Sequence, residues 1–399
     1  MRANRPPRPQ PPATLVAELL WRRFGSLPAV SPFSLGTMRA IDSAAQMEGV
    51  LRAAVAAGLN HIETAAAYGP AETFLGQGLI RLQREEVVPA GGWLITSKLL
   101  PGPDLPTAQD QLRAMLRRLG VARLDGLAVH GINRSEHLDW ALVGPGAAFL
   151  AWATGEGLVG QIGFSSHGST PLIERALASG RFAFCSLHLH WFDQERLPLA
   201  RAALAQGIGV MAISPADKGG RLFDPPAALL ADCAPFHPLE LAYRFLLDQG
   251  ISTLTLGASQ PSDLAMANAI AAATSPRQPW LSPAQHQALA RLEAAGRGRL
   301  GAERCGQCRA CLPCPNDVPI PALLRLRNLA VGHGLQGFAQ ERYNLINRAG
   351  HWWETVDAEA CAACGACLPR CPHQLPIPQL LADTHRRLVA RPGRRLWDD

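Results

Sequence analysis

Lysine is almost absent from this 399-residue chain, because only Lys98 and Lys218 among its 38 basic residues are lysines. Arginine therefore serves wherever a positive charge alone is sufficient. The two lysines mark positions that call for a compact amine with an adjustable pKa, which arginine cannot provide. Tyrosine is nearly as scarce, with Tyr68, Tyr243 and Tyr343 as its three positions. These few residues are the first candidates for chemistry.

Two further absences limit the class of protein. No apolar run approaches the ~20 residues that a membrane-spanning helix needs, and the first residues lack the apolar segment of a secretion signal. The formal charge of +6 is weak support for nucleic-acid binding, because the densest basic stretches, 2–8 and 386–395, are proline-bearing ends typical of solvated tails. We therefore expect a cytoplasmic protein that binds neither membrane nor nucleic acid.

Cysteine, by contrast, is concentrated near the C-terminus. Two runs, each followed by a proline, hold eight of the ten cysteines: Cys305, Cys308, Cys311 and Cys314, then Cys361, Cys364, Cys367 and Cys371. Three cysteines at two-residue spacing wrap one 4Fe–4S cluster, and the fourth is placed to bind the other cluster. We expect one cluster on Cys305, Cys308, Cys311 and Cys371, and a second on Cys361, Cys364, Cys367 and Cys314.

Zinc and disulfides are the alternatives for these runs. Zinc usually takes two C-x2-C pairs, so the third cysteine beside each pair is surplus to a tetrahedral site. Disulfides need an oxidising compartment, for which the chain shows no export signal. The first run has two residues between Cys311 and Cys314 where the second has three, so Cys314 departs from the usual spacing. Cys185 and Cys233 lie far upstream and are expected to be small core residues.

Strand and helix patterns alternate through most of the chain. Residues 1–16 are proline-rich and expected to be disordered. Candidate strands lie at 33–37, 61–63, 93–97, 124–130, 160–165, 184–188, 208–213 and 252–256, with helical stretches such as 43–58, 71–81, 107–120 and 171–179 between them. Eight repeats over residues 17–276 predict a TIM (β/α)8 barrel. A doubly wound open sheet is the alternative, but no G-x-G-x-x-G motif follows the first strand.

A smaller domain is expected after the barrel. Residues 277–300 indicate a helix and a linker, and residues 301–385 a small, mostly helical ferredoxin-like domain with two 4Fe–4S clusters. Residues 386–399 are expected to form a basic tail.

Four polar side chains lie at the ends of the second, third and fourth predicted strands or on the loops that follow them. Glu63 ends the second, Tyr68 lies on the next loop, Lys98 follows the third and His130 ends the fourth. Reacting groups of TIM barrels gather at these strand ends. A nearby ammonium should lower the pKa of a phenol, a carboxylate can hold that ammonium, and an imidazole can orient a carbonyl oxygen. The set suits proton transfer to an oxygen while hydride moves to or from carbon.

These motifs resemble the aldo-keto reductase family over about residues 20–275. The resemblance rests on the opening hairpin WRRFG, on LGTM at 35–38, on GLNHIETAAAYGPAETFLGQGL from Gly58, on TSK ending at Lys98, on LDGLAVHG and on IGFSSH. It implies that Tyr68 is the general acid, Lys98 its partner, Glu63 the partner of the lysine, and His130 the substrate-orienting group. Glu63 stands where the family has aspartate. With the cysteine runs behind it, the chain resembles the subgroup with a ferredoxin-like tail.

The same resemblance implies a nicotinamide site. It assigns cofactor contacts to Thr37, Ser165, Ser166, Ser214, Lys218, Gly257, Ser259 and Asn268. A stacking tyrosine of the family is replaced by Ile213, and no arginine or lysine that could hold a 2′-phosphate occurs between Leu256 and Ser275. NADPH is therefore expected from the family, and NADH is permitted by the sequence.

Two functions follow. The first is an NAD(P)H-dependent enzyme acting on a small carbonyl or alcohol, whose clusters serve electron transfer, with a possible redox partner protein, or redox sensing. The alternative is a non-catalytic, regulatory protein that senses nicotinamide and docks a redox partner through the cluster domain. Hydride carries two electrons whereas each cluster normally passes one, and no flavin motif bridges the two.

Overall fold

The computed structural model describes residues 20–275 and 278–390. The expected tail at 1–16 and the end of the expected basic tail, 391–399, lie outside the described residues. The described residues form two compact units: one of residues 20–219, 242–275 and 278–280, the other of residues 220–241 and 281–390. We describe each unit by itself.

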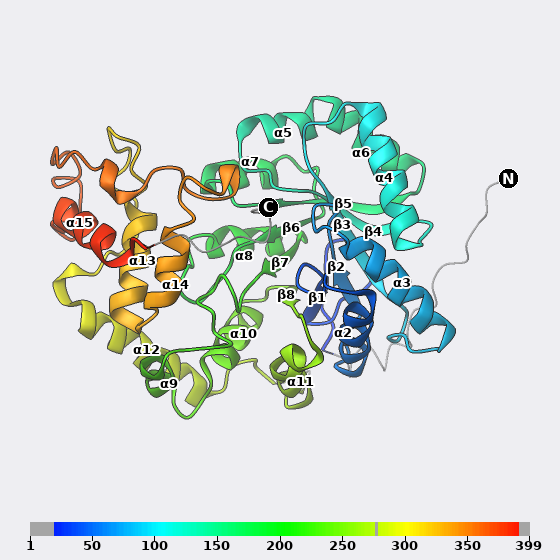
Figure 1. Ribbon diagram of the computed structural model, residues 1–399, viewed down its shortest axis with the longest axis horizontal. Helices are drawn as coiled ribbons and strands as arrows, with labels where there is room; N and C mark the ends of the chain where they lie inside the picture. Colours follow the sequence, from blue (N-terminus) through cyan, green and yellow to red (C-terminus); the bar gives the residue numbers. More distant parts are fainter. Residues whose placement is uncertain (1–19, 276–277, 391–399) are drawn as a thin grey trace. The chain divides into compact units, whose positions relative to one another are not determined.

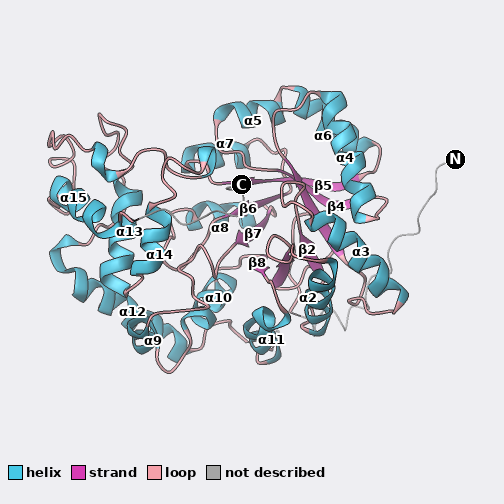
Figure 2. Ribbon diagram, viewed as in Figure 1, coloured by secondary structure: helices cyan, strands magenta, loops and turns pink. Residues whose placement is uncertain are grey.

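The first unit is a closed barrel of eight parallel strands, paired in chain order from β1 to β8 and back to β1 (Figures 1 and 2). The strands are β1 Phe33–Gly36, β2 His61–Glu63, β3 Leu94–Leu99, β4 Leu124–Val129, β5 Val159–Ser166, β6 Phe184–Leu187, β7 Gly209–Ile213 and β8 Thr253–Gly257. The expected TIM barrel is confirmed. The open-sheet alternative is wrong, because β8 pairs with β1 and leaves no sheet edge.

Helices surround the strands, and local sequence explains where several begin and end. They are α2 Ala44–Ala56, α3 Ala71–Arg84, α4 Leu105–Leu119, α5 Ser135–Leu142, α6 Pro145–Gly155, α7 Thr170–Ala178, α8 Leu197–Ala205 and α11 Ala265–Ala272, while α10 Pro238–Asp248 crosses the division between the units. Asp104 caps α4 by accepting a hydrogen bond from the Thr107 N–H, and Gly120 ends it at a φ of 65°, a left-handed conformation that glycine adopts without strain.

The barrel is filled by apolar side chains at the end where the strands begin. A short hairpin, in which Arg22 pairs with Val30, places Phe24 against the ring of Phe184, with ring centroids 5.0 Å apart. Deeper in the barrel, buried His61 bonds Ser34 and Thr96 through its two ring nitrogens, and burial lowers its pKa to about 3. With this end packed, the polar strand ends lie at the opposite rim, which we call the mouth.

The second unit contains helices and loops (Figure 2). Its helices are α9 Ala227–Cys233, α12 Pro283–Leu300, α13 Ile320–His333, α14 Gln336–Tyr343 and α15 Ile377–Leu388. The stretch 277–300, expected as helix and linker, contains α12, and residues 220–241 group with this unit rather than with the barrel. Helix α15 reaches Leu388, so residues 386–388 of the expected tail are helical.

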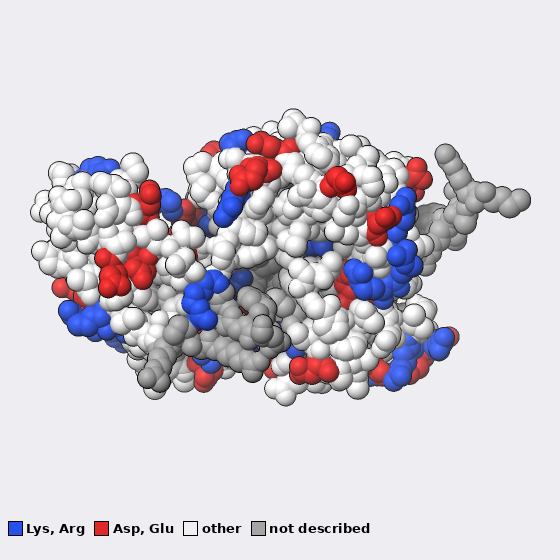
Figure 3. All heavy atoms as spheres, turned by 45° about the horizontal axis from the view of Figure 1, so that its top comes forward, with Lys and Arg blue, Asp and Glu red and all other residues white. Residues whose placement is uncertain are grey.

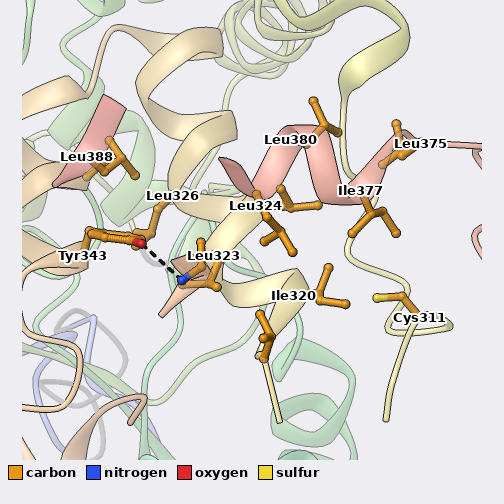
Figure 4. Packing of buried hydrophobic residues seen from close by; sticks show 14 of the residues in the cluster. Cys311, Ile320, Leu323, Leu324, Leu326, Tyr343, Leu375, Ile377, Leu380 and Leu388 are labelled. Carbon is orange, nitrogen blue, oxygen red and sulfur yellow. Dashed lines mark hydrogen bonds between the residues drawn. The ribbon is translucent and has the colours of Figure 1, made fainter. Parts of the chain in front are cut away.

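A separate apolar core holds the second unit together. Ile320, Leu323 and Leu324 of α13 pack with Ile377 and Leu380 of α15, and all are nearly inaccessible to solvent (Figure 4). The core reaches the cysteine runs, because Cys311 and Cys367 are themselves buried in it. Burial of this kind is what stabilises a small domain, so this unit has its own source of stability.

Charges of both signs are interspersed on the face of the molecule drawn in Figure 3. Among the described residues, no helix is both long and apolar enough to cross a membrane.

Candidate active site and cysteine cavities

Glu63, Tyr68 and Lys98 meet at the mouth of the barrel. The Lys98 ammonium contacts the Glu63 carboxylate in an ion pair whose side chains are 2% and 4% exposed. Lys98 Nζ also donates a hydrogen bond of 2.8 Å to the Tyr68 hydroxyl and one of 3.1 Å to the Thr64 carbonyl oxygen. The Tyr68 hydroxyl in turn donates to Glu63 Oε1 at 3.3 Å. Glu63 and Tyr68, from the end of β2 and the loop after it, thus form one hydrogen-bonded group with Lys98 of β3.

His130 completes this group from the end of β4. Its ring stands edge-on to the Tyr68 ring, with centroids 5.8 Å apart and an interplanar angle of 84°. Its backbone N–H donates to the Leu99 carbonyl at 2.7 Å, which ties the imidazole to the end of β3. The structure therefore brings together all four residues that the sequence predicts as catalytic.

Burial dominates the acid–base character of the group. It raises the pKa of the Tyr68 phenol, and burial together with the charge of Lys218 lowers the pKa of Lys98 well below its usual value. Burial, Lys98 and Lys218 lower the pKa of His130 well below its usual value. The net shift of the Tyr68 pKa is therefore upward, with burial as its cause, and the lowering of that pKa by Lys98 stays a prediction.

A second network, not predicted from the sequence, links the loop of Tyr68 to the strand of Lys98. Glu72, in the first turn of α3, is 1% exposed and accepts a hydrogen bond of 2.7 Å from Ser97 Oγ. Arg118 of α4 donates to the other carboxylate oxygen through Nε at 2.9 Å and Nη2 at 2.6 Å. The sequence offered one signal, a glutamate at an otherwise apolar helical position. Its partner Arg118 is 46 residues away and is identified only by the fold.

The residues expected to hold a nicotinamide lie at several strand ends. The hydroxyls of Ser165 and Ser166, at the end of β5, are buried. Ser165 Oγ accepts from the Gly131 N–H at 3.0 Å, and Ser166 Oγ donates to the Ile132 carbonyl at 2.6 Å. Thr37 is buried after β1 and donates to Thr64 Oγ1 at 2.8 Å. These hydroxyls therefore brace the loops around the mouth.

The remaining predicted cofactor residues follow β7 and β8. Ser214 has a φ of 52°, and its carbonyl accepts the Lys218 N–H at 3.1 Å in a tight turn. Gly257 ends β8, and Ser259 donates through both its N–H and its hydroxyl to Asp263. Asn268 is exposed on α11. No contact in the structure joins Ser259 or Asn268 to the group around Tyr68 within the described residues.

Histidines at the ends of β5 and β6 are a further feature that sequence reasoning missed. The Nε2 atoms of His167 and His188 are 3.0 Å apart, and the His188 and His190 ring centroids are 5.6 Å apart. Burial, His167 and Lys218 are the leading causes that lower the pKa of His188 well below its usual value. The alternation LHLH after the sixth strand was the available signal, because alternate residues of a strand face the same side.

The eight cysteines of the two runs line two cavities of the second unit. The first is lined by Cys305, Cys308, Cys311 and Cys371. The second is lined by Cys314, Cys361, Cys364 and Cys367. The fourth cysteine of each run therefore faces the cavity of the other run. Cys185 is buried in β6 and Cys233 is buried at the end of α9, so both occupy core positions.

Comparison with known proteins finds similarity in the barrel part of the chain. Residues 32–224 match the model of the aldo/keto reductase family. This match supports a relationship between the barrel and the aldo/keto reductase family. An aldo-keto reductase of Mycolicibacterium vanbaalenii is 29% identical over 216 residues, which are 52% of this chain and 72% of that protein.

Solved structures of the family share the fold. The holo form of an aldo-keto reductase from Bacillus halodurans matches with a TM-score of 0.57 at 18% identity, over 68% of this chain and 95% of the other. A Bombyx mori aldo-keto reductase in complex with NADP matches with a TM-score of 0.54 at 20% identity, over 68% of this chain and 92% of the other. At these identities the likeness concerns the barrel fold.

The Glu63–Lys98 pair allows a test of folding stability. We expect Glu63→Gln to lower the free energy of unfolding by about 3 kcal/mol, because removing one partner of a buried ion pair leaves an uncompensated buried charge. Urea denaturation of the purified protein measures the change. The exposed pair of Arg52 and Glu85 provides the control, since Glu85→Gln should cost less than about 1 kcal/mol. Equal losses in the two variants would contradict a special role for the buried pair.

Proposed function

We propose that the protein is an NAD(P)H-dependent oxidoreductase of aldo-keto reductase type, which reduces a small carbonyl compound or oxidises the corresponding alcohol. The observation that carries this proposal is the group at the mouth of the barrel, in which Lys98 Nζ lies 2.8 Å from the Tyr68 hydroxyl and contacts Glu63. A hydroxyl, an amine and a carboxylate joined in this way are suited to proton transfer, and family and fold agree with it.

In this proposal, Tyr68 gives its proton to the carbonyl oxygen. Its raised pKa keeps the phenol protonated at neutral pH, which is the form that a general acid requires. Lys98 holds the hydroxyl in position, and Glu63 holds Lys98. His130, whose lowered pKa keeps it neutral, donates an N–H to the same carbonyl oxygen and orients it.

Lys218 gives the mouth a positive charge that suits the pyrophosphate of a dinucleotide. The charge of Lys218 is strong enough there to lower the pKa values of Lys98 and His130, after burial, and an anionic pyrophosphate would relieve this repulsion. We assign the predicted cofactor residues, Thr37, Ser165, Ser166, Ser214, Lys218, Gly257, Ser259 and Asn268, to this contact. When bound, the nicotinamide supplies or accepts the hydride. Two structurally similar aldo-keto reductases, one from Bombyx mori in complex with NADP and another complexed with NADPH, favour NADPH.

We further propose that the second unit holds two 4Fe–4S clusters. The donor set of each cavity is four thiols, which is what a cubane cluster requires. The Gln307 N–H points to Cys305 Sγ at 3.4 Å, the kind of hydrogen bond that stabilises a thiolate ligand. The clusters would pass single electrons to a redox partner protein or respond to the redox state of the cell.

Tyr68→Phe tests the catalytic part of the proposal. The ring still fills its place, but the proton donor is lost, so kcat for reduction of a generic aldehyde should fall by about 100- to 10,000-fold. NADPH binding, measured by fluorescence titration, should change little. Tyr243 is the control, because its phenol is buried and packs against Phe33, so Tyr243→Phe should leave activity unchanged. Full activity of Tyr68→Phe would assign the proton to another group, and absence of any NADPH oxidation by the unaltered protein would favour the regulatory alternative.

The raised pKa of Tyr68 predicts the pH dependence. Reduction needs the protonated phenol, and a raised pKa keeps that proton on above the ordinary value of ~10. The kcat/KM for reduction should therefore not decline between about pH 6 and 9, while alcohol oxidation, which needs the phenolate, should rise throughout that interval. A decline of reduction centred below about pH 9 would instead show that Lys98 lowers the pKa of the phenol.

Iron and sulfide analysis tests the clusters. Anaerobically purified protein should contain about eight irons and eight sulfides per chain, as two cubanes require. Cys364→Ser should lose about half of both, because only the second cavity loses a ligand. Cys233→Ala is the control and should keep the full complement, since Cys233 lies in α9. Zinc without sulfide in the unaltered protein would contradict the proposal.

A further inference from the structure

Glu72 is a buried carboxylate that contacts two elements besides its own. It lies in the first turn of α3 and is 1% exposed. One carboxylate oxygen accepts the hydroxyl of Ser97, from β3, at 2.7 Å. The other accepts two N–H groups of Arg118, from α4, at 2.9 and 2.6 Å. Both carboxylate oxygens are therefore used, each toward a different element.

The bond to Ser97 acts on the strand that carries Lys98. Successive side chains of a strand point to opposite faces, so Ser97 faces outward to α3 while Lys98 faces the mouth of the barrel. On the inner face Lys98 Nζ reaches the Tyr68 hydroxyl at 2.8 Å, and on the outer face Ser97 Oγ reaches Glu72 at 2.7 Å. The strand is thus held from both faces at two neighbouring positions.

A short stretch of chain joins Tyr68 to Glu72. The Tyr68 carbonyl accepts the Ala71 N–H at 3.2 Å, and α3 begins at Ala71. The segment from Tyr68 to Glu72, the two neighbouring residues of β3 and the two hydrogen bonds between them therefore form a closed ring. Within such a ring, a movement of α3 relative to β3 also moves the Tyr68 hydroxyl relative to Lys98.

Arg118 connects this ring to α4. The helices α3 and α4 approach so closely that a Cβ at Gly76 would lie 2.1 Å from the Arg118 carbonyl oxygen, which only glycine allows without a shift of the backbone. The Arg118 guanidinium forms an ion pair with the buried carboxylate of Glu72. A hydrogen bond between charged partners is about twice as strong as a neutral one. Glu72 is thereby fixed to α4 as well as to β3.

We propose that Glu72 is a positioning residue, which sets the distance between the Tyr68 hydroxyl and Lys98 by holding Ser97. The inference rests on the proposed function, because it concerns proton transfer from Tyr68. Glu72 lies on the outer face of β3, away from Lys98, so it acts on this transfer through the placement of the two groups. A misplacement of about 1 Å between reacting groups can lower a rate about 100-fold.

Ser97→Ala and Glu72→Gln test this role. Ser97→Ala removes the bond to β3 and leaves the contact between Glu72 and Arg118 in place. In Glu72→Gln the amide has one acceptor oxygen where the carboxylate has two, so one of the two connections is lost. In both variants kcat for reduction of a generic aldehyde should fall about 10- to 100-fold. NADPH affinity, measured by fluorescence titration, should change little, and the same titration counts the folded sites, so that kcat is expressed per site.

Asp125→Ala is the matched control. The Asp125 carboxylate accepts the Ile95 N–H at 2.8 Å, so this variant also removes one buried hydrogen bond from β3, but near the start of the strand rather than beside Lys98. It should lower the midpoint of thermal unfolding and leave kcat per site near that of the unaltered protein. The double variant of Ser97→Ala and Glu72→Gln should lose no more activity than Glu72→Gln alone, because both changes act on one bond.

Contrary results separate the positioning role from the proposed function. Unchanged kcat per site in Ser97→Ala, with activity lost in Tyr68→Phe, would overturn the positioning role and leave the proposed function in place. Equal losses in Ser97→Ala and Asp125→Ala would also overturn it, since any weakening of β3 would then have the same effect. If Glu72→Gln yields no folded protein, the comparison of these two variants decides. Absence of NADPH oxidation by the unaltered protein would refute the proposed function, and the positioning role with it.

Discussion

The buried ion pair of Glu63 and Lys98 is the constraint around which the mouth of the barrel is organised. Charges removed from water are costly unless each finds partners. The Thr64 carbonyl and the Tyr68 hydroxyl are two such partners, and both come from the loop that follows β2. The hydrogen bond from Lys98 that offsets part of the cost of burying the ion pair also holds the Tyr68 hydroxyl in place. Stability of the barrel and placement of the Tyr68 hydroxyl, the proposed proton donor, depend on one set of hydrogen bonds.

Much of the barrel could be predicted from the sequence, because buried parallel strands appear as short apolar runs between helical stretches. All eight expected strands are present, with ends that differ by one or two residues. The positions of Glu63, Tyr68, Lys98 and His130 followed from their places at strand ends. The sequence does not indicate how deeply each of these side chains is buried. The direction of the Tyr68 pKa shift depends on burial, and burial of a loop residue cannot be inferred from its neighbours in the chain.

Contacts between residues that are far apart in the sequence could not be predicted either. The bond from Arg118 to Glu72 joins two helices, and the facing nitrogens of His167 and His188 come from different strands, so neither has a local pattern. Residues 220–241 group with the C-terminal unit although they lie in the middle of the barrel sequence. The grouping of the eight cysteines around two cavities, by contrast, could be predicted, because the spacing within each run is a local pattern.

The scarcity of lysine has a practical consequence for the folded protein. Lys98 is 2% exposed, whereas Lys218 is partly exposed on the turn after β7. Reagents that acylate side-chain amines will therefore modify the native chain at Lys218 before Lys98, and a ligand seated in the mouth will shield both. Acylation followed by mass spectrometry thus becomes a footprint of occupancy at the mouth of the barrel, with no background from lysines elsewhere in the sequence.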